Sequence, residues 1–146
     1  MTIEEMFEKF AADRDLMFRR FSGTEDGPGQ MMIGLEGTNG QFLAFAMGQE
    51  EERLFIFYVS LGVTVEEDEE DRMLPVLMEL NYRLRIGAFY IDPATRVLTY
   101  RLTHYLIGRD EDCEEMMLRL VTNGARIADE YAPGLMEVLQ EAAEED

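Results

Sequence analysis

The sequence predicts an α+β protein built on an antiparallel sheet, with helices at the N-terminus, in the middle and at the C-terminus. Apolar residues recur at helical spacing near both ends of the chain and again between residues 73 and 84. Short apolar runs separated by tight-turn residues fill the two regions between these helices, as they do in β-hairpins. Because the strands come in hairpins and are not each followed by a helix, an antiparallel sheet is expected.

The chain of 146 residues is expected to form one domain, residues 1–146, because it contains no linker that would separate two. Hydrophobic residues make up 47% of it, but no apolar run reaches the roughly 18 residues that span a membrane. The acidic start lacks the basic and apolar regions of a signal peptide. The single cysteine, Cys113, fits a reducing compartment. We therefore expect a cytoplasmic protein that does not bind membranes.

The N-terminal region begins with a helix expected over residues 3–13. Thr2 and Glu5 match a capping box, in which each side chain binds the backbone amide of the other residue. Four apolar residues follow at helical spacing: Ile3, Met6, Phe7 and Phe10. A short strand is expected over 16–22, and a loop of glycine, proline and acidic residues over 23–29 ends it.

Three further strands are expected over residues 31–36, 42–47 and 54–59. Between the first two, Asn39-Gly40 predicts a type I′ hairpin turn, which requires positive φ at both central residues. The run over 54–59 is apolar on both faces, which predicts an interior strand covered on both sides. A helix of this chain or a second subunit would provide the second cover.

The middle helix and a second hairpin account for residues 66–105. Six acidic residues over 66–71 lead into the helix, and Pro75 is placed in its first turn. The buried stripe of this helix is expected at Met73, Leu77, Leu80 and Leu84. Gly87 marks the change to strands over 86–91 and 97–105, which flank a type I turn at residues 92–95. The even-numbered residues from 98 to 102 are predicted to be buried, and the odd-numbered residues from 99 to 103 to face water.

Two helices are expected at the C-terminus, one beginning at Asp110 and a short last one beginning at Pro133. Asn123-Gly124 is a weak point that kinks or splits the first of them. The predicted order of elements is therefore α-β-β-β-β-α-β-β-α-α.

No catalytic, cofactor-binding or metal-binding residue is predicted. One histidine and one cysteine cannot complete a structural zinc site, which takes four ligands. His104 follows the strand alternation and is interpreted as a packed or edge residue. Cys113 is interpreted as a small core residue, because the acids beside it disfavour a thiolate. No phosphate-binding loop or nucleophile elbow is present, so we expect a protein that is not an enzyme and uses no cofactor.

The formal charge of -18 repels the phosphates of nucleic acids and anionic membranes, so neither is expected as a partner. A basic or aggregation-prone protein partner suits this charge better, although the charge also serves solubility alone. Eleven methionines are present, and methionine fills core gaps or lines adaptable binding surfaces. Six of them are hard to bury all at once and are assigned either to the core or to a groove or dimer face: Met31, Met32, Met47, Met78, Met116 and Met136.

The segment from Leu80 to Phe89 resembles the YbjN-type domain, a relative of the type III secretion chaperone fold. The matching residues are Leu80-Asn81 near the helix end, Gly87-Ala88 at the strand start and Asp92 at the turn. The resemblance implies an α-β-β-β-α-β-β-α core. Secretion chaperones of this shape are small acidic homodimers that hold an unfolded client segment against apolar patches, and YbjN-type proteins resemble regulators of stress or motility responses. The family brings no catalytic residues.

We therefore expect a non-enzymatic protein-binding module, chaperone-like or regulatory, that acts as a homodimer. Its partner or dimer surface is placed on the strands at Leu43, Phe45, Phe55 and Phe57, with acidic residues around it. One alternative is a signalling or stress-response regulator that contacts a folded partner. Another is a small-molecule-binding or enzymatic domain, for which the sequence offers no candidate site.

Overall fold

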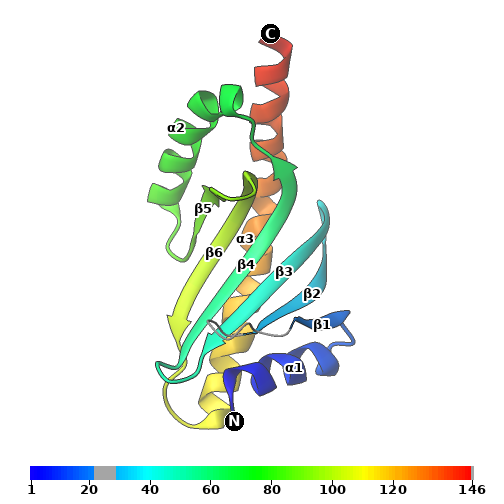
Figure 1. The fold of residues 1–146 in the computed structure, drawn as a ribbon, viewed down its shortest axis with the longest axis vertical. Helices are drawn as coiled ribbons and strands as arrows, with labels where there is room; N and C mark the ends of the chain where they lie inside the picture. Colours follow the sequence, from blue (N-terminus) through cyan, green and yellow to red (C-terminus); the bar gives the residue numbers. More distant parts are fainter. Residues whose placement is uncertain (22–28, 146) are drawn as a thin grey trace.

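The computed structural model describes residues 1–21 and 29–145 and shows one antiparallel six-stranded sheet with three helices (Figure 1). The elements in chain order are α1 Ile3–Asp13, β1 Phe18–Phe21, β2 Gln30–Gly37, β3 Gly40–Gln49, β4 Leu54–Thr64, α2 Glu67–Arg83, β5 Ala88–Ile91, β6 Val97–Tyr105 and α3 Asp110–Glu145. The strands lie in the order β1-β2-β3-β4-β6-β5, and every neighbouring pair is antiparallel. The predicted α+β class and the three helix positions are confirmed.

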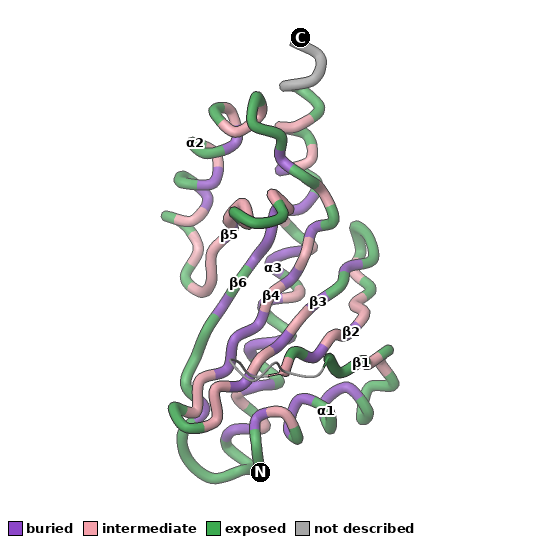
Figure 2. The backbone as a smooth tube through the Cα atoms, in the orientation of Figure 1, coloured by how far each residue is buried: buried purple, intermediate pink, exposed green. Residues whose placement is uncertain are grey.

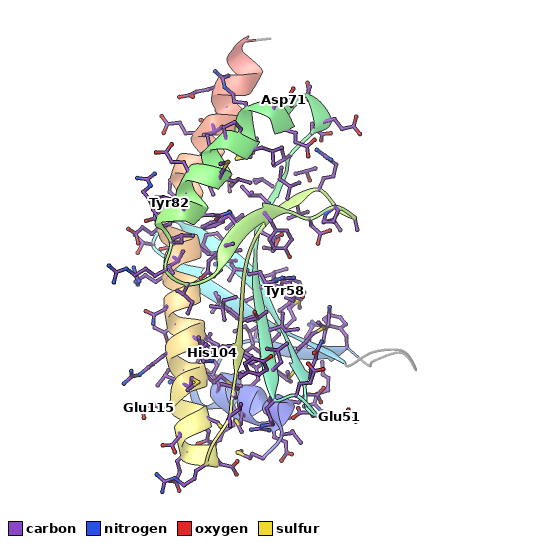
Figure 3. All side chains as sticks on the ribbon, turned by 90° about the vertical axis from the view of Figure 1, so that its left-hand side faces the viewer. Glu51, Tyr58, Asp71, Tyr82, His104 and Glu115 are labelled. Carbon is purple, nitrogen blue, oxygen red and sulfur yellow. The ribbon has the colours of Figure 1, made fainter. Side chains whose placement is uncertain are left out.

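All three helices pack on the same face of the sheet. Phe55 and Phe57 of β4 point to this side and are fully buried, and the ring of Phe7 from α1 lies 6.0 Å from that of Phe55. Figure 3 views the sheet nearly edge-on, with α3 on one side and Tyr58 of β4 on the other. The interior position of β4 between β3 and β6 confirms one prediction. In the described residues no helix lies on the other face of the sheet. Of the two covers expected for that face of β4, a helix of this chain is therefore not the one found.

The hairpin between β2 and β3 differs from the predicted type I′ turn. Gly37 and Gly40 pair across the strands, so Thr38 and Asn39 are the central residues, and neither has positive φ. The carboxylate of Asp129 in α3 accepts hydrogen bonds from the Thr38 amide at 3.0 Å and the Asn39 amide at 2.8 Å. The amides of the turn are thus satisfied by a helix from the other end of the chain. The predicted loop over 23–29 lies outside the described residues except for Gly29.

Helix α2 begins earlier than the position of Pro75 suggests. Glu66 and Glu69 form a reciprocal capping box, and acidic residues fill the first turn, where the positive end of the helix dipole favours them. Pro75 therefore lies inside the helix, and its predicted place in the first turn is wrong. Of the predicted buried stripe, Met73, Leu77 and Leu80 are buried, whereas Leu84 is only partly buried and caps the C-terminus.

The C-terminal region is one continuous helix, so the predicted break at Asn123-Gly124 and the separate last helix are wrong. A Cβ on Gly124 would lie 3.0 Å from Leu102 Cδ2 and 3.1 Å from Phe57 Cε1, so glycine allows α3 to approach the sheet closely. Pro133 lacks the amide that would bind the Asp129 carbonyl in a regular helix. The Asn39 side chain donates to this carbonyl instead, at 2.9 Å.

Candidate protein-binding face

The helix-free face of the sheet carries a row of side chains that crosses five strands. Arg19, Met32, Phe45, Tyr58 and Arg101 lie opposite one another on β1, β2, β3, β4 and β6. Residues opposite one another in antiparallel strands point to the same face. The three apolar and aromatic members are half-buried, whereas both arginines are exposed. We call these five residues the central row and this side of the sheet the open face.

Further apolar side chains lie on both sides of the central row. Leu43 is 45% exposed, whereas Ile56 is buried and stands opposite Met47 in the β3–β4 register. Figure 2 shows that the strands alternate between buried and intermediate or exposed residues, as a sheet covered on one side does. A shallow cavity of about 590 Å³ lies at the β5–β6 end, where Phe45, Tyr58 and Arg101 contribute to its lining. The open face is therefore apolar at its centre and hollowed at one end.

The cavity at this end of the open face is lined by one arginine, one aspartate and a tyrosine that contacts the arginine. The Arg101 guanidinium lies 5.8 Å from the centre of the Tyr90 ring, within the range of a cation–π contact. Burial raises the pKa of Tyr90, Tyr58 and Asp92 raise it further, and Arg101 opposes them. Asp92 lines the same cavity, but its Oδ1 accepts hydrogen bonds from the amides of the turn that follows, Ala94 at 2.8 Å and Thr95 at 3.1 Å.

The structure separates the four residues predicted to form the partner surface. Leu43 and Phe45 lie on the open face, whereas Phe55 and Phe57 are fully buried under the helices. The reason is the register across the β3–β4 turn, where Phe45 pairs with Tyr58, so that odd-numbered residues of β3 share a face with even-numbered residues of β4. Of these four predicted residues, only Leu43 and Phe45 are therefore on a face that a partner can reach.

Met32, Tyr58, Arg19 and Arg101 belong to the open face, although they were not predicted as site residues. Two signals for them were present in the sequence. The run over 54–59 is apolar on both faces, so Tyr58 had to lie either in the core or on the second covered face, and Met32 was among the methionines assigned either to the core or to a groove. The places of Arg19 and Arg101 depend on which strands lie beside β4, and local sequence patterns do not contain that information.

A second apolar surface lies on the outer side of α2. Leu74, Met78 and Tyr82 recur every four residues and are 48%, 78% and 90% exposed. They face away from the stripe that packs on α3, and Figure 3 shows Tyr82 on the outside of the helix. We call these three residues the α2 stripe.

The described residues contain no group of three or more His, Cys, Asp or Glu side chains placed to hold a metal ion. Cys113 is 1% exposed, which confirms its interpretation as a core residue. His104 is exposed, and its Nδ1 lies 2.7 Å from the Tyr105 carbonyl oxygen. Neither residue lies on the open face, because His104 points to the helix side with Leu102 and Tyr100.

A family model described as "Putative bacterial sensory transduction regulator" (YbjN) matches residues 4–137 of the chain. The chain belongs to the YbjN family. The match covers nearly the whole sequence and confirms the resemblance. No curated protein and no solved structure matches the chain. None of the helices in the described part of this YbjN chain is long and apolar enough to cross a membrane.

The residues that carry the YbjN resemblance fix α2 against the edge of the sheet. Asn81 Nδ2 donates to the Phe89 carbonyl at 2.9 Å, and Asn81 Oδ1 accepts from the Phe89 amide at 2.8 Å. These are the backbone groups that a further strand would bind, so Asn81 also protects the edge strand β5. Gly87 has φ +72° and leaves room for the Tyr100 hydroxyl, which donates to the Ile86 carbonyl at 2.8 Å.

Proposed function

We propose that this YbjN-family chain is a non-enzymatic regulatory module that binds a partner protein on the open face. The observation that carries the proposal is the apolar centre of this face, formed by Met32, Phe45 and Tyr58 with Leu43 beside them. No helix of the described residues covers it. Apolar patches on one face of a sheet mark interaction surfaces, because water contact with them costs free energy.

The family description supports a regulatory role, since it names a regulator of sensory transduction and no catalytic activity. The acidic residues of α1, α2 and α3 lie on helices that pack against the other face, so they keep the protein soluble without occupying the binding surface. A cytoplasmic location fits the free, buried Cys113 and stays a prediction.

Two kinds of partner are open to such a module. A chaperone-like role implies an unfolded segment of a client, held mainly by apolar contacts whose strength changes little with salt. A regulator would contact a folded protein, and binding led by charged residues would weaken as salt concentration rises. We favour the regulator, because the family description points to it and to no client.

We infer that the α2 stripe forms a homodimer interface distinct from the open face. Leu74, Met78 and Tyr82 present an apolar strip on one helix, and two such strips pair about a twofold axis to bury each other. The resemblance to the secretion chaperone fold implies a homodimer as well.

Changing Met78 to Glu tests this interface. Because Met78 is 78% exposed, Met78→Glu is expected to leave the free energy of unfolding within about 0.5 kcal/mol of wild type. It is expected to convert a dimer to a monomer in size-exclusion chromatography with light scattering. Leu118→Glu, an exposed apolar site on α3, is the matched control and should stay dimeric. A dimeric Met78→Glu protein would place the interface elsewhere.

Quantitative capture of the partner from native lysate tests the binding proposal. Wild type, Phe45→Glu, Leu43→Glu and the control Leu118→Glu serve as baits, with mass spectrometry as the readout. The account predicts proteins whose capture falls at least tenfold with both open-face variants and stays unchanged with the control. Phe57→Glu differs from these surface variants, because a charge at a fully buried core site costs several kcal/mol and should unfold the chain. Partners retained equally by all the folded baits would contradict the proposal.

A further inference from the structure

The two arginines of the central row place a positive charge at each end of the apolar centre of the open face. Arg19 and Arg101 are exposed at the two ends of the row, and within the described residues neither forms an ion pair with a carboxylate. Other basic side chains do form such pairs: Lys9, Arg20, Arg53, Arg83, Arg96, Arg109, Arg119 and Arg126. A chain with 31 acidic residues thus leaves two cations unpaired on its apolar face.

Two acidic residues beside this face in the described part of the chain form no ion pair with either arginine. Asp92 is held by the amides of Ala94 and Thr95, and Glu36 is exposed toward the far end of β2, where it pairs in register with Gln41. The net charge of -18 acts over longer distances, but salt screens it beyond roughly 8 Å at physiological ionic strength. At contact distance a partner therefore meets apolar side chains with a cation at each end.

We propose that the open face binds an amphipathic helix of the partner, whose apolar stripe lies along the central row and whose acidic residues pair with Arg19 and Arg101. This inference rests on the proposed function and names the chemistry of its partner. The row crosses four strand-to-strand spacings, so its ends are ~19 Å apart, which corresponds to ~13 residues of helix. The acidic residues are therefore expected about 14 residues apart, because 14 residues make close to four whole turns and bring both onto the side of the apolar stripe.

A helix suits this face better than an extended segment. The strands β2, β3, β4 and β6 are paired on both sides, so their backbone groups are already bound and cannot accept another strand. A segment lying across the face must therefore satisfy its own backbone hydrogen bonds, which a helix does and an extended chain does not.

A second copy of the chain is a poorer occupant of the open face. If two copies pair face to face about a twofold axis along the strands, Arg19 of one copy meets Arg101 of the other. If the axis runs along the central row, each arginine meets its own equivalent. Like charges facing each other destabilise both arrangements, whereas acidic residues of a partner remove the repulsion.

Two synthetic helical peptides of 17 residues test the inference. Both carry the same apolar stripe, and they differ only in two flanking residues 14 positions apart, which are Glu in one and Lys in the other. Fluorescence anisotropy against wild type should show the Glu peptide binding about tenfold more tightly at low salt, with the difference shrinking at high salt. Arg19→Glu with Arg101→Glu should reverse the preference. Arg85→Glu, a single charge reversal outside the face, should leave it unchanged.

Phe45→Glu distinguishes failure of this inference from failure of the proposed function. If Phe45→Glu weakens both peptides while wild type and the arginine variant alike bind the Glu and Lys peptides equally, the face binds helices without charge preference and the inference is overturned. If Phe45→Glu changes neither the peptides nor the capture of native partners, the proposed function falls as well. Circular dichroism confirms that each variant is folded, and Tyr58→Ala replaces Phe45→Glu if that variant unfolds.

Discussion

At the scale of single residues, the most consequential buried polar group is the Tyr100 hydroxyl. It donates to the Ile86 carbonyl at 2.8 Å, while its ring packs 5.1 Å from that of Phe89. Burial raises the pKa of Tyr100 to about 12. This one side chain joins β6 to the segment between α2 and β5, and thereby fixes the edge of the open face.

The raised pKa of Tyr100 makes the stability of the protein depend on alkaline pH. The unfolded chain loses the tyrosine proton near pH 10, but the folded chain keeps it to about pH 12. The stabilisation that comes from the raised pKa of Tyr100 is therefore fully present below pH 10. It is lost as pH rises from 10 to 12, and the free energy of unfolding falls by at most about 1.4 kcal/mol per pH unit. Urea unfolding across this range should show wild type losing stability more steeply than Tyr100→Phe. Parallel loss in both proteins would contradict this prediction.

Asn81 shows what single residues reveal before a structure is known. The Leu80-Asn81 and Gly87 positions carried the family resemblance, yet nothing in the sequence indicated their contacts. In the structure Asn81 binds both backbone groups of Phe89, and Gly87 makes room for Tyr100. A motif can thus be recognised from sequence, while its physical role appears only when its partners are placed beside it.

At the scale of elements, the β2–β3 turn and α3 stabilise each other across the chain. Asp129 receives the two turn amides, and Asn39 returns a hydrogen bond to the carbonyl that Pro133 leaves without its helical donor. Glycine and proline rules predict a break in this helix, and the rules fail because they consider only neighbours in sequence. Contacts with the hairpin and close packing of Gly124 on the sheet keep α3 continuous.

Asn39→Ala should lower the free energy of unfolding by about 1 kcal/mol, because the Asp129 carbonyl loses its donor. In a Pro133→Ala background the helix regains an amide at residue 133 that binds this carbonyl. The same Asn39→Ala change should then cost clearly less, as measured by urea unfolding of the four proteins in a double-mutant cycle. Equal costs in both backgrounds would show that Asn39 and Pro133 act independently.

At the scale of the whole molecule, the sequence predicted the fold class, the three helix positions and the interior place of β4. It could not predict the strand order, because β6 inserts between β4 and β5 through pairings distant in sequence. That order and the β3–β4 register decide which side of each strand faces the helices. The predicted surface therefore mixed two open-face residues, Leu43 and Phe45, with two core residues, Phe55 and Phe57.

The two faces of the sheet differ in the side chains that lie over them. Helices that carry most of the acids cover one face of the sheet, while the other face holds an apolar row between two unpaired arginines. The α2 stripe is apart from both, on the outer side of its helix. We propose the open face as the partner surface and the α2 stripe as the separate dimer surface.

Oxidative footprinting of methionines tests the central claim most directly, because the chain carries natural probes on each surface. Met32 and Met47 lie on the open face, and Met78 lies on α2. Hydroxyl-radical labelling, read by mass spectrometry, is compared for the free protein and for its complex with the captured partner. The account predicts that the partner protects Met32 and Met47 and leaves the reactivity of Met78 unchanged. Protection of Met78 alone, with Met32 and Met47 as reactive as before, would contradict it.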